Sequence, residues 1–276
     1  MVETNCLVLK IGGSELETLA HYAANDFVAA LIKAVRRLRK NAPVVLVHGG
    51  GKKIAALQAR LGLEAKFVDG LRVTDDASLD VAEMVLSGLL NKRLVARFVS
   101  AGLPAVGLSG VDNQLIQVGK RTRNGYDWGW VGDVAQTNTG VIELLLQHHI
   151  VPIISPISLG PNGHTFNVNA DHAAAALASA LGAAELVFVS NVPGVLLGSE
   201  KRCAARLTPQ EVQARIASGE IYGGMIPKVR SALAALERGV KRVRIADLKG
   251  LAHKQGTCFA LPKRAAQHTW QKEQNK

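Results

Sequence analysis

The sequence lacks the marks of secreted, membrane-spanning and metal-centred proteins. Its three cysteines, Cys6, Cys203 and Cys258, are scattered along 276 residues and form neither a metal-binding spacing nor a plausible disulfide framework. No apolar run approaches the roughly 20 residues that a membrane-spanning helix needs. The first strand-like run begins at Leu7, which leaves no room for a signal peptide before it. These absences favour a protein of the reducing cytoplasm.

The common phosphate-binding and metal-binding fingerprints are also absent. The chain contains neither Gly-x-x-x-x-Gly-Lys-Ser/Thr nor Gly-x-Gly-x-x-Gly. This argues against a P-loop and against the usual dinucleotide-binding fold. The chain has no His-Glu-x-x-His motif and no paired cysteine spacing either. We therefore expect no metal centre built from protein side chains.

Negative charge is scarce. Lysine and arginine outnumber aspartate and glutamate by 33 to 22, which gives a formal net charge of +11. Part of the excess lies at 36–40, and part in 262–276, which we expect to be a basic, disordered tail. Aromatic residues make up only 4% of the chain and no recognition-helix motif accompanies the basic runs, so we expect no nucleic-acid partner. A positive field instead suits an enzyme with anionic small-molecule substrates.

Two short apolar runs end at glycines near the start of the chain. Leu7–Ile11 is followed by Gly12 and Gly13, and Val44–His48 by three glycines at 49–51. This pattern is typical of a parallel strand that opens into a loop and then a helix. Glycines let backbone N–H groups approach an anion, and a helix N-terminus adds partial positive charge. The two loops predict a site for a polyphosphate or for a phosphate in transit; alternatively, the glycines only form tight turns.

The rest of the chain alternates between strand and helix patterns. We expect strands at 105–109, 151–155, 185–190 and 242–246, and helices at 26–39, 141–148 and 170–181. A long helix should start at Asp75 or Asp76 and continue through Val95. Residues 110–137 lose helical periodicity and predict an inserted β-hairpin, while 164–167 predict a short edge strand. The alternation predicts a mainly parallel sheet sandwiched by helices.

Two lysines stand where an ammonium group is poorly accommodated. Lys10 lies near the end of a hydrophobic strand, just before Ile11-Gly12-Gly13, where solvation is poor. Lys228 lies at the start of an expected helix, where a cation is unfavourable unless an anion binds there. Both lysines therefore indicate a negatively charged ligand.

Three further side chains have two readings each. Asp171, in the first turn of its helix, could orient lysines or magnesium, or be only a helix-terminal charge. Arg72 could bind a carboxylate through two N–H groups of its guanidinium, or it could be a surface arginine of a hairpin. His48 could be a base or a ligand, or it could brace the glycine loop through hydrogen bonds.

Eight short motifs, in their order along the chain, resemble the acetylglutamate kinases of the amino-acid kinase family over roughly residues 5 to 247. They are Lys10-Ile-Gly-Gly13, His48-Gly-Gly-Gly51, Gly70-Leu-Arg-Val-Thr-Asp75, Asn91-Lys92, Gly107-Leu-Ser-Gly110, Asn167-Val-Asn-Ala-Asp171, Ser190-Asn-Val-Pro-Gly194 and Gly224-Met-Ile-Pro-Lys228. The resemblance implies an α/β fold, an open three-layer αβα sandwich around a mainly parallel sheet. It also implies transfer of the γ-phosphoryl group of MgATP to the side-chain carboxylate of N-acetyl-L-glutamate. The product would be N-acetyl-L-glutamyl 5-phosphate, for arginine biosynthesis.

The resemblance also assigns roles by position. Lys10 and Lys228 would stabilise the transition state, and Asp171 would hold both lysines in place. Arg72 would bind the α-carboxylate of the substrate and Asn167 its α-substituent. Such chemistry needs positioning and charge neutralisation but no covalent nucleophile, and an attacking carboxylate needs no general base. The glycines that would offer N–H groups to the phosphoryl group and substrate are Gly13, Gly50 and Gly51.

The resemblance places nucleotide binding mainly in the second part of the chain. We expect residues 1–180 to form an acyl-amino-acid-binding and phosphoryl-transfer lobe, and 181–261 a nucleotide-binding lobe of the same domain. The expected cofactors are ATP and Mg²⁺. The implied nucleotide-binding residues are Gly12, Ser190, Asn191, Val192, Pro193, Gly194, Val195, Ile221 and Tyr222.

Two other functions stay open. A lysine-pathway kinase, acting on aminoadipate or glutamate carried by a small acidic protein, shares Gly107–Asp112 and Asn191–Gly194, and a basic chain suits an acidic carrier. The motifs around Arg72 and Asn167 fit the acetylglutamate enzymes better. A nucleotide-sensing regulator on the same fold would not need the two lysines. Because the segment after Asp247 is short and the extra first helix of arginine-inhibited relatives is missing, the resemblance favours a simple homodimer without arginine control.

Overall fold

The computed structural model describes residues 5–13, 15–16, 26–68, 71–123 and 126–260, so the expected tail at 262–276 lies outside the described residues. The α-helices are α1 (Asp26–Leu38), α2 (Gly51–Arg60), α3 (Asp76–Glu83), α4 (Asn91–Ser100), α5 (Gly140–Gln147), α6 (Ala170–Ala180), α7 (Pro209–Ala217), α8 (Met225–Glu237) and α9 (Leu248–His253). A π-helix, η2 (Met84–Leu90), joins α3 to α4, and short 3₁₀ turns are η3 (Asp112–Gln114) and η4 (Pro161–Gly163). Within the described residues, no helix combines the length and apolar character that crossing a membrane requires.

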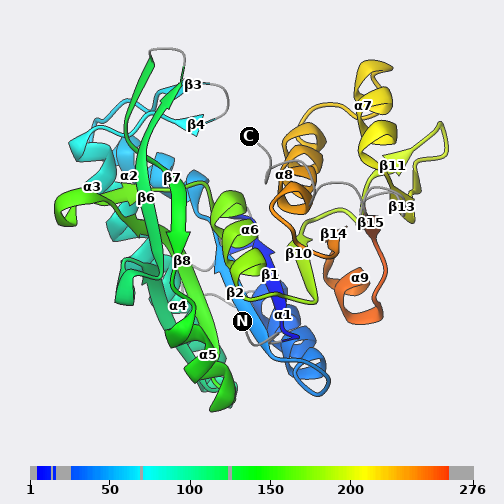
Figure 1. Cartoon of the computed structure of the whole chain (residues 1–276), viewed down its shortest axis with the longest axis horizontal. Helices are drawn as coiled ribbons and strands as arrows, with labels where there is room; N and C mark the ends of the chain where they lie inside the picture. The colour runs from blue at the N-terminus through cyan, green and yellow to red at the C-terminus, as the bar shows by residue number, and fades with distance from the viewer. Residues whose placement is uncertain (1–4, 14, 17–25, 69–70, 124–125, 261–276) are drawn as a thin grey trace, which may run out of the picture.

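Eleven strands form the main sheet, and most of its neighbouring strands are parallel. Its order is β13-β15-β14-β10-β1-β2-β8-β6-β7-β9, with β5 also paired to β8 (Figure 1). The first strands are β1 (Leu7–Ile11), β2 (Val44–His48), β5 (Ala105–Gly110), β6 (Ile116–Arg123), β7 (Tyr126–Thr137) and β8 (Val151–Leu159). The others are β9 (Thr165–Asn167), β10 (Glu185–Val189), β13 (Arg206–Leu207), β14 (Val243–Ala246) and β15 (Thr257–Phe259). Two small hairpins pair β3 (Phe67–Val68) with β4 (Leu71–Arg72) and β11 (Leu196–Leu197) with β12 (Arg202–Cys203).

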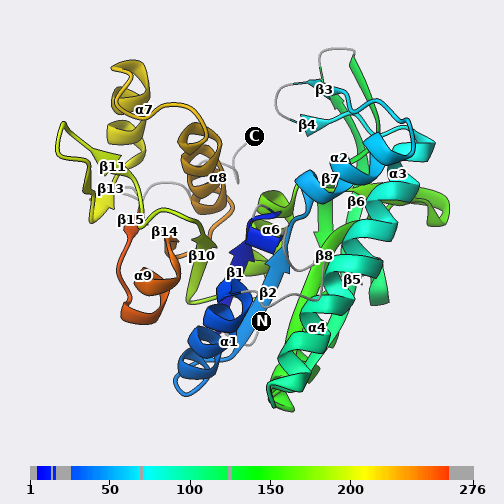
Figure 2. The ribbon, with the colours of Figure 1, turned by 180° about the vertical axis from the view of Figure 1, so that it is seen from behind.

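Alternate residues of the central strands enter two separate hydrophobic cores. In β2, for example, Val45 and Val47 pack in the core under α5, α6 and α8, whereas Val44 and Leu46 pack in the core under α1 and α4. Figure 1 shows α6 and α8 on one side of the sheet, and Figure 2 shows α1 and α4 on the other. Because successive side chains of a strand point to opposite faces, a strand of apolar residues can support helices on both faces. The expected αβα sandwich is confirmed.

Side-chain caps fix where several helices begin. Asp75 is the N-cap of α3 and accepts a bond of 2.8 Å from the backbone N–H of Ser78. Asn169 caps α6 by accepting a bond of 2.7 Å from the N–H of Asp171. Thr208 and Glu211 form a complete capping box at the start of α7. These side chains satisfy N–H groups that have no partner inside the helix.

Two expected elements differ from the structure. The long helix beginning after Asp75 is interrupted, because residues Met84–Leu90 form a π-helix between α3 and α4. The strand expected at an edge, β9, instead lies between β8 and β7 and pairs with both, so the edge assignment is wrong. The expected hairpin is present as β6 and β7, and it extends the main sheet through β8 and β9.

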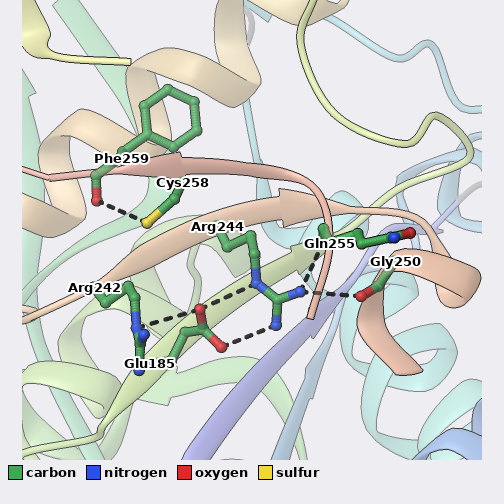
Figure 3. A network of polar contacts seen from close by, with 7 residues as sticks. All are labelled: Glu185, Arg242, Arg244, Gly250, Gln255, Cys258 and Phe259. Atoms are coloured by element: carbon green, nitrogen blue, oxygen red, sulfur yellow. Dashed lines mark hydrogen bonds and ion pairs between the residues drawn. The ribbon is translucent and has the colours of Figure 1, made fainter. Parts of the chain in front are cut away.

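The amino ends of the strands carry a network of buried polar contacts (Figure 3). Arg244 of β14 binds both carboxylate oxygens of Glu185 of β10, at 3.1 Å through Nε and at 2.9 Å through Nη2. Its Nη1 donates to the carbonyl oxygens of Gln255 at 2.7 Å and Gly250 at 3.2 Å. The network therefore ties α9 and the loop after it to the sheet.

Basic side chains near the same end are used for capping. Arg36 donates to the carbonyl oxygen of Ala101 and Arg39 to that of His149, at the ends of α4 and α5. Cations suit the carboxyl ends of helices, where carbonyl oxygens lack partners. Part of the basic run at 36–40 thus serves helix capping.

Candidate active site

The carboxyl ends of β1 and β2 open into a cavity of about 280 Å³. Both glycine loops, the start of α6, the β3–β4 hairpin and the β7–β9 region contribute to its wall. Because parallel strands end at the same edge of a sheet, side chains far apart in the sequence meet here. The polar and glycine lining residues are Lys10, Gly13, Gly49, Gly50, Gly51, Arg72, Asn167, Asn169 and Asp171.

The two glycine loops approach each other too closely for any side chain. A Cβ atom on Gly13 would lie 2.7 Å from the backbone nitrogen of Gly50 and 3.0 Å from that of Gly51. A Cβ on Gly50 would lie 2.5 Å from Cδ1 of Leu90. Within the described residues, the N–H groups of Gly50 and Gly51 have no backbone acceptor. They therefore remain available to an anion at the start of α2.

Lys10 and Asp171 form an ion pair at the mouth of this cavity. The ammonium nitrogen of Lys10 lies 2.6 Å from Oδ1 of Asp171, and the side chains are 18% and 15% exposed. The other oxygen of Asp171, Oδ2, accepts a bond of 3.2 Å from the hydroxyl of Ser231 on α8. Asp171 is in the first turn of α6, where the helix dipole favours a carboxylate. The aspartate can thus hold the lysine beside the glycine loops.

Lys228 has a different partner from the expected one. Its ammonium nitrogen donates to Oγ of Ser190 at 2.6 Å, at the end of β10. Burial lowers the pKa of Lys228, and the positive charge of Lys10 lowers it further. Among the described contacts, Asp171 is therefore the partner of Lys10, and Ser190 is the acceptor of Lys228. Two cations so placed favour a bound anion between them.

Arg72 points its guanidinium at the glycine loop. It donates to the carbonyl oxygen of Gly51 at 3.0 Å and to the side chain of Gln58, and it lies 4.6 Å from the ring centre of Phe67. Burial lowers its pKa. The arginine is thus held inside the site by the protein, which disfavours the alternative of a surface arginine.

Asn167 joins the site from the end of β9. Its amide nitrogen donates to Oγ1 of Thr74 at 3.2 Å, and the residue lines the cavity. Apolar residues complete the wall, and no sequence pattern indicated their place at the site. They are Ile54, Phe67, Leu86, Val131, Pro156, Val168 and Ala170.

His48 lies behind the loop and is wholly buried. Burial lowers its pKa to about 4, so the ring is neutral near pH 7. Its Nδ1 lies 3.1 Å from the carbonyl oxygen of Gly49, and its Nε2 lies 3.2 Å from Nδ2 of Asn91. These contacts support the bracing alternative. Asn91 was part of a recognised motif, but no sequence pattern indicated this contact.

The expected nucleotide-binding residues are only partly brought together. Ser190, with Lys228, lies at the carboxyl end of β10, and Gly12 lies at that of β1, the neighbouring strand. Val195 and Ile221 are buried in the core instead, at 0% and 2% exposure. Tyr222 is 68% exposed. The loop that directly follows Ser190 holds the remaining expected residues, Asn191, Val192, Pro193 and Gly194.

Comparisons with known proteins agree with this geometry. The sequence pattern of the amino acid kinase family matches residues 5–247. An acetylglutamate kinase of Roseiflexus is 49% identical over 252 residues, which cover 91% of this chain and 92% of that protein. The N-acetylglutamate synthase of Neisseria gonorrhoeae, solved with coenzyme A and N-acetyl-glutamate, superposes with a TM-score of 0.77 at 26% identity. That match covers 94% of this chain and 60% of the synthase chain. Carbamate kinase of Giardia lamblia shares the fold, with a TM-score of 0.61 at 18% identity over 95% of this chain and all of that chain.

The fold and the site define a phosphotransferase of the αβα type. The chain belongs to the amino acid kinase family, as its motifs predicted. Membership of a kinase family implies the use of ATP.

Proposed function

We propose that the protein transfers the γ-phosphoryl group of ATP to the side-chain carboxylate of N-acetyl-L-glutamate, as a step of arginine biosynthesis. A carboxylate oxygen attacks the γ-phosphorus, the bond from that phosphorus to the bridging oxygen breaks, and ADP leaves with the electron pair. The products are ADP and N-acetyl-L-glutamyl 5-phosphate. The observation that carries the proposal is one cavity that unites Lys10, the glycine loops, Arg72 and Asn167 in a chain 49% identical to an acetylglutamate kinase.

The proposed catalytic groups act on charge. Lys10 and Lys228 neutralise the transferring and leaving oxygens, and Asp171 keeps Lys10 in place at 2.6 Å. The N–H groups of Gly13, Gly50 and Gly51 bind the moving phosphoryl group and the attacking carboxylate. Donors fixed before the reaction are effective because they need no reorganisation in the transition state.

The proposed acceptor site binds the α-carboxylate and the acetylamino group of the substrate. The guanidinium of Arg72, already held against the glycine loop, binds the α-carboxylate. The amide oxygen of Asn167 accepts from the α-amide N–H. The apolar wall formed by Ile54, Leu86 and Val131 provides space for an acetyl methyl group.

The proposed nucleotide site follows β10. Gly12, the loop of residues 190–194 and Tyr222 would contact ATP, within a lobe of residues 181–261, while Val195 and Ile221 would support this site from the core. We propose that Mg²⁺ accompanies the nucleotide. In the described residues no three His, Cys, Asp or Glu side chains gather into a metal-binding group, which suits an ion held mainly by phosphate oxygens and water.

We also propose a cytoplasmic homodimer. The outer face of η2 and α4 carries a groove of about 400 Å³ lined by Gly88, Leu89, Lys92, Arg93, Ala96, Arg97 and Ser100. Met84 and Val99, on the same segment, are each more than half exposed. A Cβ atom at Gly88 would meet nothing within 4 Å. Packing within the described residues therefore does not require a glycine at this position, although glycine weakens a helix. We infer that a second copy of the chain covers this face. In Gly88→Leu the molar mass measured by light scattering should therefore fall towards that of the monomer.

The alternatives receive less support. The curated relatives that match most of this chain at 41–49% identity are named acetylglutamate kinases. A carrier-protein kinase would need room for a macromolecular substrate, whereas the acceptor cavity is about 280 Å³. A regulator without activity would not need two lysines at one anion site.

The test is ADP release with MgATP and N-acetyl-L-glutamate, L-glutamate or N-acetyl-L-aspartate, each with and without arginine. Turnover confined to N-acetyl-L-glutamate and insensitive to arginine is expected. If none of the three supports turnover, the free-substrate assignment is wrong and an acidic carrier protein becomes the next substrate.

A further inference from the structure

His48 and Asn91 form a buried pair behind the glycine loop that the reaction described above leaves without a role. Both side chains are 0% exposed. His48 is the last residue of β2, and Asn91 is the first residue of α4, directly after the π-helix. The two therefore connect the catalytic loop to the helix on the outer face of the sheet.

The contacts of Asn91 determine which way its amide points. Its Nδ2 lies 2.8 Å from the carbonyl oxygen of Ile153 and 3.3 Å from that of Leu108. Two carbonyl oxygens at these distances require a donor, so this atom is the nitrogen and not the oxygen. The same nitrogen lies 3.2 Å from Nε2 of His48. An amide nitrogen accepts no hydrogen bond, so a proton on Nε2 of His48 would face another donor. Nε2 is therefore the unprotonated ring nitrogen.

The proton of the neutral ring is then on Nδ1. That nitrogen lies 3.1 Å from the carbonyl oxygen of Gly49, to which it donates. Burial lowers the pKa of His48 to about 4, which keeps the ring in this one-proton form near pH 7. The contact with Asn91 thus selects the tautomer that can hold the Gly49 carbonyl.

Within the described part of the chain, Asn91 leaves a buried oxygen without a hydrogen-bond partner, and this loss of stability supports a functional role for its amide nitrogen. Its Oδ1 is buried without a hydrogen-bond partner among the described residues. The same oxygen fills the space over Gly107, where a Cβ would lie 1.9 Å from it. A buried acceptor without a partner is destabilising, so the donor end of this amide compensates for it.

The Gly49 carbonyl controls the orientation of a proposed catalytic donor. The carbonyl of Gly49 and the N–H of Gly50 belong to one planar trans peptide, in which they point in opposite directions. A bond that fixes the carbonyl towards His48 therefore turns the Gly50 N–H away from His48. The Gly50 nitrogen faces Gly13, whose Cβ position would be 2.7 Å from it, and both residues line the cavity. Consecutive glycines have little conformational preference of their own, so an external bond is needed.

We propose that His48 is a positioning residue for phosphoryl transfer. Held in one tautomer by Asn91, its Nδ1–H fixes the Gly49–Gly50 peptide so that the Gly50 N–H points at the transferring phosphoryl group. This inference rests on the proposed function and adds two residues to it. His48 is then neither a base nor a ligand.

Two substitutions separate the two ring nitrogens. In His48→Asn the side-chain nitrogen occupies about the place of Nδ1 and can still donate to Gly49, whereas in His48→Gln it occupies about the place of Nε2 and cannot. We expect His48→Gln to lower kcat on the order of 10²-fold, since small displacements of a catalytic group have effects of this size. KM values for ATP and N-acetyl-L-glutamate should change little, and His48→Asn should recover most of the lost kcat. His148→Gln, at the exposed end of α5, is the matched control.

The outcomes separate this inference from the proposed function. Wild-type protein without turnover of N-acetyl-L-glutamate would count against the proposed function. Wild-type turnover with equal kcat in His48→Gln, or equal losses in His48→Asn and His48→Gln with native unfolding temperatures, would overturn the positioning role. Independently of activity, ¹⁵N NMR of the histidine rings should show His48 protonated at Nδ1 at pH 7. Protonation at Nε2 would overturn the inference.

Discussion

The two ends of the parallel sheet hold their charges in different ways. At the amino ends, Glu185 and Arg244 form an ion pair of 2.9 Å in which the side chains are only 10% and 5% exposed. The arginine uses its remaining donors on backbone carbonyl groups. At the carboxyl ends, Lys10 and Asp171 pair at 2.6 Å beside an open cavity. A second cation, Lys228 in the first turn of α8, donates to Ser190 just after β10.

The difference indicates which charges serve the fold and which serve a ligand. A buried pair in which each nitrogen of the arginine has a partner can be compensated entirely within the chain. Lysines beside a cavity, one of them with a pKa lowered by burial, are better compensated by a bound anion. We therefore expect substitutions at the amino ends to change stability and those at the carboxyl ends to change catalysis.

The largest expected effect is that of Lys228→Ala. Loss of a cation that stabilises transition-state charge should lower kcat by about 10³-fold or more, with KM values little changed. Steady-state kinetics measures this, and Lys249→Ala, exposed on α9, is the control. If only KM rose, Lys228 would be a binding residue and not a catalytic one.

At the opposite end, Arg244→Met should leave kcat unchanged and lower the free energy of unfolding by about 3 kcal/mol, because Glu185 would keep a buried charge without its main partner. Urea unfolding measures the loss. Arg242→Met is the matched control, since Arg242 is 59% exposed and lies 3.5 Å from the same carboxylate. Its expected effect is below about 1 kcal/mol. Equal losses in both variants would remove the distinction between the two arginines.

His48 makes the carboxyl end sensitive to acid. The folded-state pKa is about 4, below the unfolded value of 6.5, so the unfolded chain binds more protons between these values. The contribution of His48 to the free energy of unfolding is complete above pH 6.5. It declines as the pH falls towards 4, by up to about 3 kcal/mol. Urea unfolding of wild type and His48→Asn at several pH values should show a steeper decline in the wild type, because other groups such as His172 titrate in both proteins. Parallel pH profiles would contradict it.

The smallest expected effect is that of Arg72→Lys. An ammonium group keeps the charge but loses the fork that binds a carboxylate, so KM for N-acetyl-L-glutamate should rise about 10-fold. The affinity for ATP should not change. A fall in ATP affinity instead would mean that the acceptor and nucleotide ends of the site are assigned the wrong way round.

Much of the fold follows from local sequence. The strand and glycine patterns at Leu7–Gly13 and Val44–Gly51 predicted two parallel strands that open into glycine loops. The structure adds that these two strands are neighbours, with Leu7 paired to Val44. The caps at Asp75, Asn169 and Thr208 were predictable because each satisfies N–H groups within three residues of it.

The parts that could not be predicted depend on distant contacts. The π-helix of Met84–Leu90 brings Leu86 and Leu90 against Gly50, and no local pattern specifies such packing. The bonds from Asn91 to His48 and from Lys228 to Ser190 join residues 43 and 38 positions apart. The edge position expected for β9 was wrong because its pairing with β7 depends on the path of the hairpin.

The central claim, phosphoryl transfer to a carboxylate at the carboxyl ends of the strands, is tested most directly by trapping the product. Hydroxylamine converts an acyl phosphate into a hydroxamate, which mass spectrometry identifies. With MgATP and N-acetyl-L-glutamate, the wild-type protein should form the 5-hydroxamate in step with ADP, and Lys228→Ala should form almost none. ADP release without hydroxamate, or equal hydroxamate from Lys228→Ala, would contradict the account.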